Sequence, residues 1–418
     1  MNCQSYIDFL NNNKHEYQVI DFIERRATTE GFREFKEDKI YRQGEKIIFK
    51  FDKLIALVVM GKDFSKGANM IVSHMDSPRL DVIPNNPFVE KDGEVFCKVV
   101  PYGGIISQSW LDRPLALVGK AYNKDGEEVL IDTEKVDIHF TISSLLPHLG
   151  GRKEMKDLGY DKLMVRMGTS RPQEFLEMMY GLTEENLKFA NLSFVPSGKA
   201  MELGFGKNFS AYGYFDKDLI SAYGHDDKVC VFTELMAILD SDDTDRTKIA
   251  LFTSYEETGS GQLSGAESQF IDDIFLELAN GEQLIMRRSM RNTKVISADV
   301  CAGFDSVYAN HFEDNCKVKV GEGVGIVPFL GSKRGNDSTL EMRELIRKLC
   351  EDNNIKYQIE TTKVGEGGGG TVSTFFTIKG MQVIDVGVPV LAMHSPQELI
   401  HRNDLFSVYK LYKVFYEN

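Results

Sequence analysis

Cysteine is scarce in this chain, and its spacing excludes two common classes of small cross-linked protein. The 418 residues include six cysteines, and no two of them form a Cys-x-x-Cys pair. Disulfide frameworks and zinc knuckles depend on closely spaced cysteines, so neither is expected here. We expect buried free thiols at positions 3, 97, 230, 301, 316 and 350.

Long apolar runs and an excess of positive charge are also missing. No apolar stretch approaches the roughly 20 residues that a membrane span needs, and the segment 1–5 lacks the basic and apolar parts of a signal peptide. Lys and Arg number 49 against 63 Asp and Glu, which gives a formal net charge of −14. This balance repels phosphate backbones and anionic lipids. We therefore expect a cytoplasmic protein with no nucleic-acid or membrane partner.

Two familiar functional motifs are absent as well. No Gly-x-Ser-x-Gly elbow is present, so Ser395 has no support as a serine nucleophile. The glycine-rich stretch 365–370 is not followed by Gly-Lys-Ser or Gly-Lys-Thr, so it does not predict a phosphate loop. It is either a flexible loop or a place where the backbone approaches a substrate closely, because glycine has no Cβ. In the second case Gly369 is a candidate substrate-binding residue.

What the chain does contain is the pattern of a large folded α/β protein. Its hydrophobic content is 42%, which is typical of a compact domain. Apolar residues recur at helical spacing over 5–27, and strand-like runs follow from 46 to 60. Later segments alternate strand and helix as a βαβ fold does: a helix over 226–239, strands over 248–254 and 294–298, a helix over 338–352, a strand over 383–390 and a helix over 405–416.

The stretch 86–218 has a different character. Its β-branched and aromatic runs are separated by turn segments such as 91–93 and 124–126. We interpret it as a β-rich domain inserted into the α/β domain, which would consist of residues 1–85 and 219–418. The predicted fold class is α/β, with a mixed, mostly parallel sheet flanked by helices and an inserted β-rich domain.

Acidic and histidine side chains follow four of the apolar runs. The runs and the polar residues after them are 69–73 with His74 and Asp76, 248–255 with Glu256 and Glu257, 294–298 with Asp299, and 386–393 with His394. Asp226 opens a helical stretch instead. Ligands gather at the carboxyl ends of the strands in open α/β sheets. We therefore expect these side chains to meet in one cleft.

Each of these patterns has an ordinary explanation when it is taken alone. A His-x-Asp pair is more often structural, Asp226 and Asp227 can offset the dipole of a helix, and Glu256-Glu257 can be a solvated pair. However, adjacent carboxylates at the end of a buried strand cost free energy unless a cation or a shared proton compensates them. Oxygen and imidazole ligands suit zinc, cobalt or manganese. The combined set predicts a two-metal hydrolase.

Five motifs are similar to those of the aspartyl aminopeptidase family of zinc metallopeptidases, in its bacterial branch, and they span nearly the whole chain. They are 73–78, 256–260 together with 264–266, 297–299, 393–395, and 110–113 in the inserted domain. The resemblance implies a catalytic domain interrupted by a β-rich dimerisation domain. It also implies a homo-oligomer, namely a tetrahedral dodecamer built from dimers.

The resemblance further implies a role for each candidate site residue, with two divalent ions per subunit and zinc as the expected metal. The implied roles are one ion held by His74, Asp226 and Asp299, a second held by Asp226, Glu257 and His394, general base catalysis by Glu256, and orientation of His74 by Asp76.

Other parts of the resemblance concern the substrate. Residues 146–149 are similar to the segment of the inserted domain that reaches a neighbouring subunit's active site, so His148 is a candidate substrate-binding residue. Lys333 and Arg334 are candidates for the substrate-gripping lysine of the family. A second histidine, found in members that select acidic residues, falls at Arg152 here. The preferred N-terminal residue, acidic or not, stays open.

The predicted activity is removal of the N-terminal residue from peptides, with Glu256 taking a proton from a metal-bound water. One alternative is an N-acyl amino acid or dipeptide hydrolase on the same metal centre. Another is an inactive shell-forming or cargo-binding protein. The intact Glu256-Glu257 pair argues against inactivity, because idle buried carboxylates are costly.

Overall fold

The computed structural model describes residues 1–156, 158–169, 171–203, 218–329, 336–363 and 370–418. The chain divides into two compact units. The larger unit consists of Met1–Asp76, Ala200–Met393 and Glu398–Asn418, and the smaller unit of Ser77–Lys199 and His394–Gln397. The smaller unit thus begins at Ser77 and its main part ends at Lys199, against the expected 86–218. Its identity as a dimerisation domain stays a prediction.

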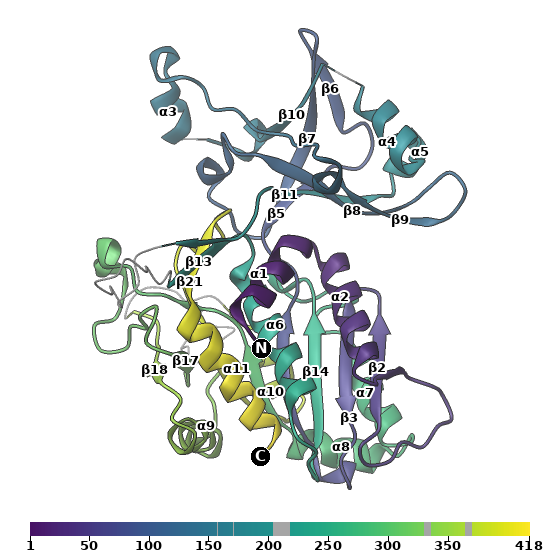
Figure 1. Cartoon of the computed structure of the whole chain (residues 1–418), viewed down its shortest axis with the longest axis vertical. Helices are drawn as coiled ribbons and strands as arrows, with labels where there is room; N and C mark the ends of the chain where they lie inside the picture. Colours follow the sequence, from purple (N-terminus) through teal and green to yellow (C-terminus); the bar gives the residue numbers. More distant parts are fainter. Residues whose placement is uncertain (157, 170, 204–217, 330–335, 364–369) are drawn as a thin grey trace, which may run out of the picture. The chain divides into compact units, whose positions relative to one another are not determined.

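The larger unit is built on a mixed sheet, which confirms the predicted fold class (Figure 1). Among the described residues, nine strands form this sheet in the spatial order β1, β2, β3, β14, β4, β15, β19, β17, β18. The four neighbours β14, β4, β15 and β19 are mutually parallel, whereas β3 and β17 pair with them in the antiparallel sense. Their bounds are β1 Arg33–Glu34, β2 Lys46–Phe51, β3 Leu54–Val59, β4 Ala68–His74, β14 Thr247–Thr253, β15 Lys294–Ala298, β17 Val324–Val327, β18 Tyr357–Ile359 and β19 Gln382–Gly387.

Both faces of this sheet are apolar, because the side chains of each strand alternate between two cores. In β3, for example, Ile55, Leu57 and Val59 belong to one core and Leu54, Ala56 and Val58 to the other. Helices cover both faces of the sheet (Figure 1), and the side chains between helices and sheet are buried. The first core includes α1 Cys3–Asn12, α2 Glu16–Thr29, α6 His225–Asp240, α9 Leu340–Asp352 and α11 Arg402–Tyr416, and the second includes α7 Phe270–Leu278, α8 Gln283–Asn292 and α10 Ser373–Thr377.

The opening helices and several later elements lie where the sequence pattern places them. α1 begins after the cap residue Asn2, whose side chain accepts a hydrogen bond from the amide of Ser5. α2 carries a capping box made by His15 and Gln18, and Gly31 beyond its end has a φ of 92°. Two small sheets complete the larger unit: β12 Met201–Leu203 with β13 Leu219–Ala222 and β21 Glu398–His401, and β16 Cys301–Ala302 with β20 Pro389–Val390.

The smaller unit is β-rich, as the composition of this stretch predicts. Its described strands pair in the antiparallel sense in the order β10, β7, β5, β11, β8, β9, and β6 also pairs with β7. The bounds are β5 Arg79–Val82, β6 Phe88–Lys91, β7 Glu94–Tyr102, β8 Leu115–Tyr122, β9 Glu128–Asp132, β10 Met164–Gly168, β11 Asn191–Pro196, α3 Gly151–Lys156, α4 Pro172–Tyr180 and α5 Glu184–Leu187.

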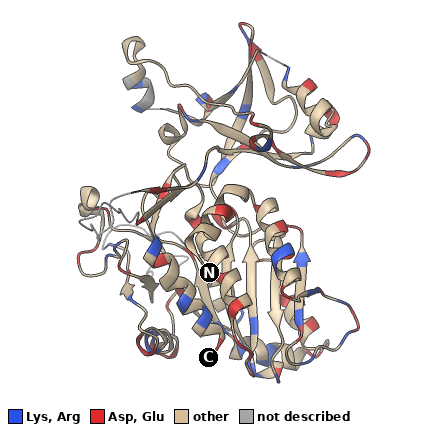
Figure 2. Cartoon of the chain, viewed as in Figure 1, with Lys and Arg blue, Asp and Glu red and all other residues tan. Residues whose placement is uncertain are grey.

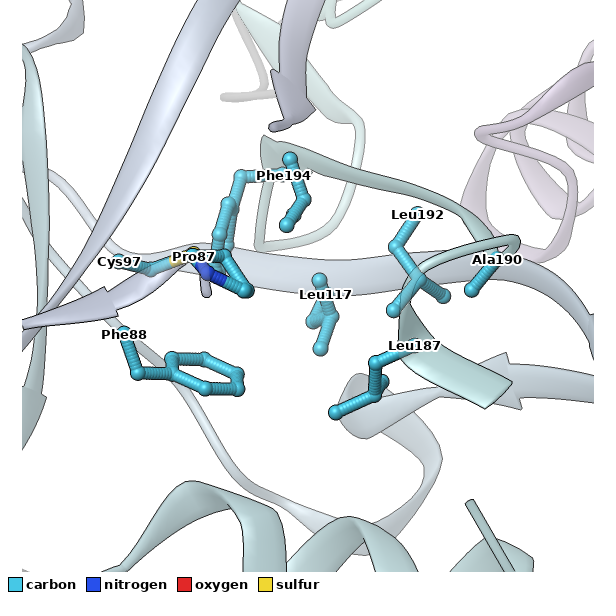
Figure 3. Close-up of a pocket in the computed structure, with 9 residues that line it drawn as sticks. Pro87, Phe88, Cys97, Leu117, Leu187, Ala190, Leu192 and Phe194 are labelled. Atoms are coloured by element: carbon cyan, nitrogen blue, oxygen red, sulfur yellow. The ribbon is translucent and has the colours of Figure 1, made fainter. Parts of the chain in front are cut away.

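A small apolar cavity of about 10 Å³ lies within the smaller unit. Figure 3 shows the side chains of Phe88, Leu117 and Leu187 directed into the same space. Its remaining lining residues are Val82, Pro87, Cys97, Ala190, Leu192 and Phe194. Burial raises the pKa of the Cys97 thiol to about 12, so this sulfur is neutral at physiological pH. A space this small and this apolar offers no polar partners to a water molecule.

Replacing Leu117 by alanine should enlarge this cavity and destabilise the smaller unit. Leu117 is 1% exposed, and the loss of a fully buried leucine costs about 2–5 kcal/mol. The single tryptophan of the chain, Trp110, is also buried in this unit, so its fluorescence during urea unfolding reports the change. Met178→Ala, at a side chain 76% exposed, is the control and should shift the free energy of unfolding by less than about 0.5 kcal/mol. An unchanged midpoint for Leu117→Ala would contradict the packing described here.

The expectation of buried free thiols holds at five of the six cysteine positions, whereas Cys316 is partly exposed. Cys3, Cys97, Cys230, Cys301 and Cys350 are buried and free, and Cys316 is free and partly exposed. Acidic and basic residues are interspersed along the ribbon of both units in the view of Figure 2. Within the described ranges, no helix has both the length and the apolar character needed to cross a bilayer.

Candidate metal centre

The parallel strands bring candidate ligands to one edge of the sheet. β14, β4, β15 and β19 are adjacent and run in the same direction, so their carboxyl ends lie side by side. His74 is the last residue of β4, Asp299 follows β15 directly, and Glu256 lies three residues after the end of β14. The structure thus places the ends of β4, β14 and β15 at one edge of the sheet.

His74 is the centre of the first ligand group. Its Nδ1 lies 3.1 Å from the backbone oxygen of Asp76, and a carbonyl oxygen only accepts hydrogen bonds. Nδ1 therefore carries a proton, and in the neutral ring Nε2 presents its lone pair. That nitrogen lies 3.3 Å from Oδ1 of Asp226 and 3.7 Å from Oδ1 of Asp299. A lone pair facing two carboxylates requires a positive charge between them.

The pKa of His74 also indicates that a positive charge is needed next to its ring. Burial alone would lower the pKa of His74, but hydrogen bonds with Asp226 and Asp299 raise it well above its usual value. The raised pKa means that the ring binds a second proton more tightly, because the surrounding carboxylates attract positive charge. A divalent cation in the same place satisfies all three groups and leaves the imidazole neutral, as a metal ligand must be.

Asp226 is held at the start of α6 by long-range contacts. Its amide donates a hydrogen bond to Oε2 of Glu398 at 2.9 Å. Asp226 and the next residue, Asp227, have non-helical backbone angles and are joined by a cis peptide bond, so the regular helix begins only after them. Asp227 accepts a hydrogen bond from the amide of His74 at 3.2 Å, and burial raises the pKa of Asp227 well above its usual value.

Glu256 and Glu257 lie on a short 3-10 turn, η6 Glu256–Thr258. The turn begins after Tyr255, which has a left-handed backbone with a φ of 65°. The amides of Glu256 and Glu257 donate to the two carboxylate oxygens of Asp76 at 3.3 and 3.2 Å. Asp76 therefore supports the two glutamates as well as His74. The sequence pattern suggested only the contact between Asp76 and His74.

Burial and mutual repulsion make these carboxylates hard to ionise together. Burial, with further raising by Asp299, brings the pKa of Glu256 to about 8, although His74 opposes the shift. Burial and the charge of Asp226 raise the pKa of Glu257 well above its usual value. Burial also raises the pKa of Asp299. Groups that resist ionisation next to one another are those that a bound cation stabilises.

Two overlapping groups of residues could hold a metal ion. The first is His74, Asp226 and Asp299, and the second is Asp226, Glu257 and His394. In each group, one ligand atom per residue lies within 4.8 Å of the others. Asp226 is common to both. Each group offers one imidazole nitrogen and two carboxylate oxygens, which is a donor set that suits zinc and similar divalent ions.

His394 reaches its position differently from what the pattern suggests. β19 ends at Gly387 and β20 at Val390, so His394 lies four residues beyond the last strand instead of following it directly. Its own backbone is left-handed, with a φ of 64°, and Ala392 has a φ of 56°. The short segment that contains it, His394–Gln397, is grouped with the smaller unit.

The described residues do not show the candidate substrate-binding residues together in one site. His148 lies on the short helix η4 Pro147–Leu149 of the smaller unit and is exposed. Lys333, Arg334 and Gly369 fall outside the described residues, as does the side chain of Arg152. Conversely, sequence patterns gave no signal for Glu398, whose contact with Asp226 joins residues 172 positions apart.

Comparison with known proteins fixes the family. Residues 9–416 match the model of the family described as aminopeptidase I zinc metalloprotease (M18). The chain belongs to the M18 family of zinc aminopeptidases. The resemblance drawn from the motifs is thereby confirmed, and the protein is a metallopeptidase that requires a divalent metal. The convergence of imidazole and carboxylate groups described above fits that requirement.

Bacterial M18 relatives match over almost their whole length. The chain is 34% identical to a probable M18 family aminopeptidase 1 of Borreliella afzelii, over 99% of this chain and 95% of the relative. The crystal structure of an M18 aminopeptidase from Thermotoga maritima superposes with a TM-score of 0.91 at 31% identity, covering 99% of this chain and 95% of that one. Aminopeptidase I from Borrelia burgdorferi B31 gives a TM-score of 0.81 at 31% identity over the same shares.

Proposed function

We propose that this M18 aminopeptidase binds two divalent cations, zinc being the first choice, and uses Glu256 as the general base. The observation that carries the proposal is the shared position of Asp226, which belongs to both ligand groups. His74 and Asp299 would complete one site, and Glu257 and His394 the other. When bound, such a pair supplies Lewis-acid activation of a water molecule and of the scissile carbonyl.

The residues of the chain supply positioning and proton transfer. Glu256 takes a proton from the attacking water and later delivers it to the leaving amine. Burial raises the pKa of Glu256 to about 8 when no cation is present, and cations held by the neighbouring ligand groups would favour the ionised form that can accept the proton. Asp76 fixes the turn through the amides of Glu256 and Glu257. The base therefore needs no rearrangement during the reaction.

A free N-terminal amine should be required for cleavage. A short peptide and its N-acetylated form, compared under saturating zinc, test this requirement directly. We expect the acetylated peptide to be hydrolysed at least about a hundredfold more slowly, because a site that pairs with an amine rejects a ligand lacking it. Faster hydrolysis of the acetylated form would instead favour an N-acyl amino acid hydrolase. A panel of peptides that differ only in the first residue would test the preference for acidic residues, which rests on the family resemblance alone.

We also propose that the enzyme is a cytoplasmic homododecamer built from dimers. The support is a yeast relative of the same fold, the Ape1 dodecamer, which superposes with a TM-score of 0.81 at 20% identity. Light scattering of the purified native enzyme should give about twelve times the monomer mass of 47.3 kDa. A monomer at micromolar concentration would contradict this proposal without affecting the metal centre.

A further inference from the structure

A buried lysine lies behind the turn that carries Glu256. Lys53 is at the tip of the β2–β3 hairpin and is 1% exposed. Its Nζ donates to Oε1 of Glu16, the first residue of α2, at 2.8 Å, and Glu16 is equally buried. Removing two charges from water is costly, and an apolar pair of similar size stabilises a fold as well or better. Packing alone therefore gives no reason for charges at this place.

The ammonium group faces two aromatic rings in addition to its carboxylate. Nζ of Lys53 lies 4.8 Å from the ring centroid of Tyr17 and 5.0 Å from that of Tyr255. Both distances are within the range of cation–π attraction, which is strongest for desolvated cations. Tyr17 follows Glu16 on α2, whereas Tyr255 belongs to the loop after β14. Lys53 thus connects α2, which carries none of the candidate catalytic or metal-binding residues, to Tyr255, the residue that precedes Glu256.

Tyr255 is the residue of this loop that most needs support. Its left-handed backbone, with a φ of 65°, is unfavourable for any residue with a Cβ and persists only where the surroundings enforce it. The turn that this conformation starts is closed by the amides of Thr258 and Ser260, which donate to the carbonyl of Tyr255 at 3.2 and 2.7 Å. A relaxation at Tyr255 would therefore rotate the turn that carries Glu256.

The same hairpin also holds the far end of the loop. The amide of Lys53 donates to Oγ of Ser264 at 3.1 Å, and that hydroxyl donates to Oδ2 of Asp52 at 2.8 Å. Ser264 in turn accepts, through its carbonyl, the amide of Ser254 at 3.0 Å. The stretch 254–264 is therefore fixed to the hairpin at both ends, with the ring of Tyr255 held by the charge of Lys53.

We propose that Lys53 is a positioning residue for the general base: it acts through the ring of Tyr255 to keep Glu256 aligned with the attacking water. The inference rests on the proposed role of Glu256. It assigns to the Glu16–Lys53 pair a function that neither residue reveals in the sequence. The contacts of Lys53 described above are with Glu16, Tyr17, Tyr255 and Ser264, none of which is a candidate metal ligand, so removal of the pair should leave metal binding intact.

The test removes both charges at once. Glu16→Gln combined with Lys53→Met removes both members of the ion pair, so that neither of these two charges is left buried without the other. Lys248 provides the control, because it is equally buried and lies on β14 at the end opposite the site, where its Nζ donates to Oγ of Ser241 at 2.8 Å and to the carbonyl of Asp242 at 2.7 Å. Purified oligomers of each variant, loaded with zinc, are compared for kcat, KM, bound zinc and melting temperature.

We expect the double variant to lose about tenfold to a hundredfold in kcat, the range that a misplacement of about 1 Å causes, with KM and bound zinc unchanged. Lys248→Met should lower the melting temperature but keep kcat within twofold. Tyr255→Leu, which leaves the ion pair in place, should reproduce the loss of kcat. Adding Tyr255→Leu to the double variant should cost little more, because both changes break one connection.

A kcat within twofold of the native value, in either the double variant or Tyr255→Leu, would overturn the proposal. So would an equal loss of kcat in Lys248→Met. If the double variant fails to fold, Tyr255→Leu decides alone. Failure of the proposed function gives a different result, since Glu256→Gln would then keep its activity whatever happens at Lys53.

Discussion

Glu256→Gln should lose between about a hundredfold and ten-thousandfold in kcat, the contribution of a general base, while its zinc content stays at the native value. Glutamine has nearly the same shape as glutamate but cannot accept the proton from the attacking water. Glu256 belongs to neither ligand group, so its replacement removes no metal ligand. Steady-state kinetics on a short peptide, with zinc measured by mass spectrometry on the same samples, checks both parts.

Glu257→Gln is the matched variant one residue away. Its carboxylate belongs to the second ligand group, so we expect this change to lower zinc content as well as turnover. The two variants carry the same substitution on the same turn, and the amides of both residues donate to the carboxylate of Asp76. They therefore form a matched pair. If the two variants behaved alike, with zinc lost from both or from neither, the division of labour between base and ligand would be wrong.

Asp226→Asn should remove both metal ions, whereas Asp299→Asn should remove one. Asp226 is common to the two ligand groups and Asp299 belongs only to the first. Replacing residues that merely support metal ligands costs about tenfold to a hundredfold in affinity or activity, so the loss of a shared ligand should exceed a hundredfold in kcat. Zinc content per subunit, after dialysis against zinc-free buffer, distinguishes about zero from about one.

Metal removal from the native enzyme is the companion experiment. A chelator should abolish activity, and zinc should restore it. Because a metal binds the folded state, its removal should also lower the melting temperature. In Asp226→Asn the chelator should no longer change the melting temperature. Two ions retained by Asp226→Asn would rule out the shared aspartate, whatever the effect on turnover.

The sequence predicted the strand ends well because that signal is local. An apolar run followed by a polar residue marks the end of a buried strand, and parallel neighbours place such ends on one edge. His74, Asp299 and Glu256 could be located in this way. The fold class followed from the alternation of strands and helices for the same reason.

Residues whose role depends on distant contacts could not be predicted. Glu398 holds the amide of Asp226, and Lys53 faces Tyr255 from a hairpin about 200 positions earlier. Neither has a pattern around it that differs from an ordinary strand or turn. His394 was singled out because it follows the apolar run 386–393, but the last strand there ends at Val390, and residues with left-handed backbone angles lie between it and the ligand position. Such backbone angles are chosen by the surrounding fold and not by neighbouring residues.

The outermost strands of the nine-stranded sheet are short, and this bears on solubility at high concentration. β1 has two residues and β18 has three, so each edge offers few unpaired amides and carbonyls to a strand from another molecule. Uncontrolled fibre growth through this sheet is thereby disfavoured. Concentrated samples of the folded enzyme should stay free of thioflavin-binding aggregates until partial unfolding exposes the longer inner strands.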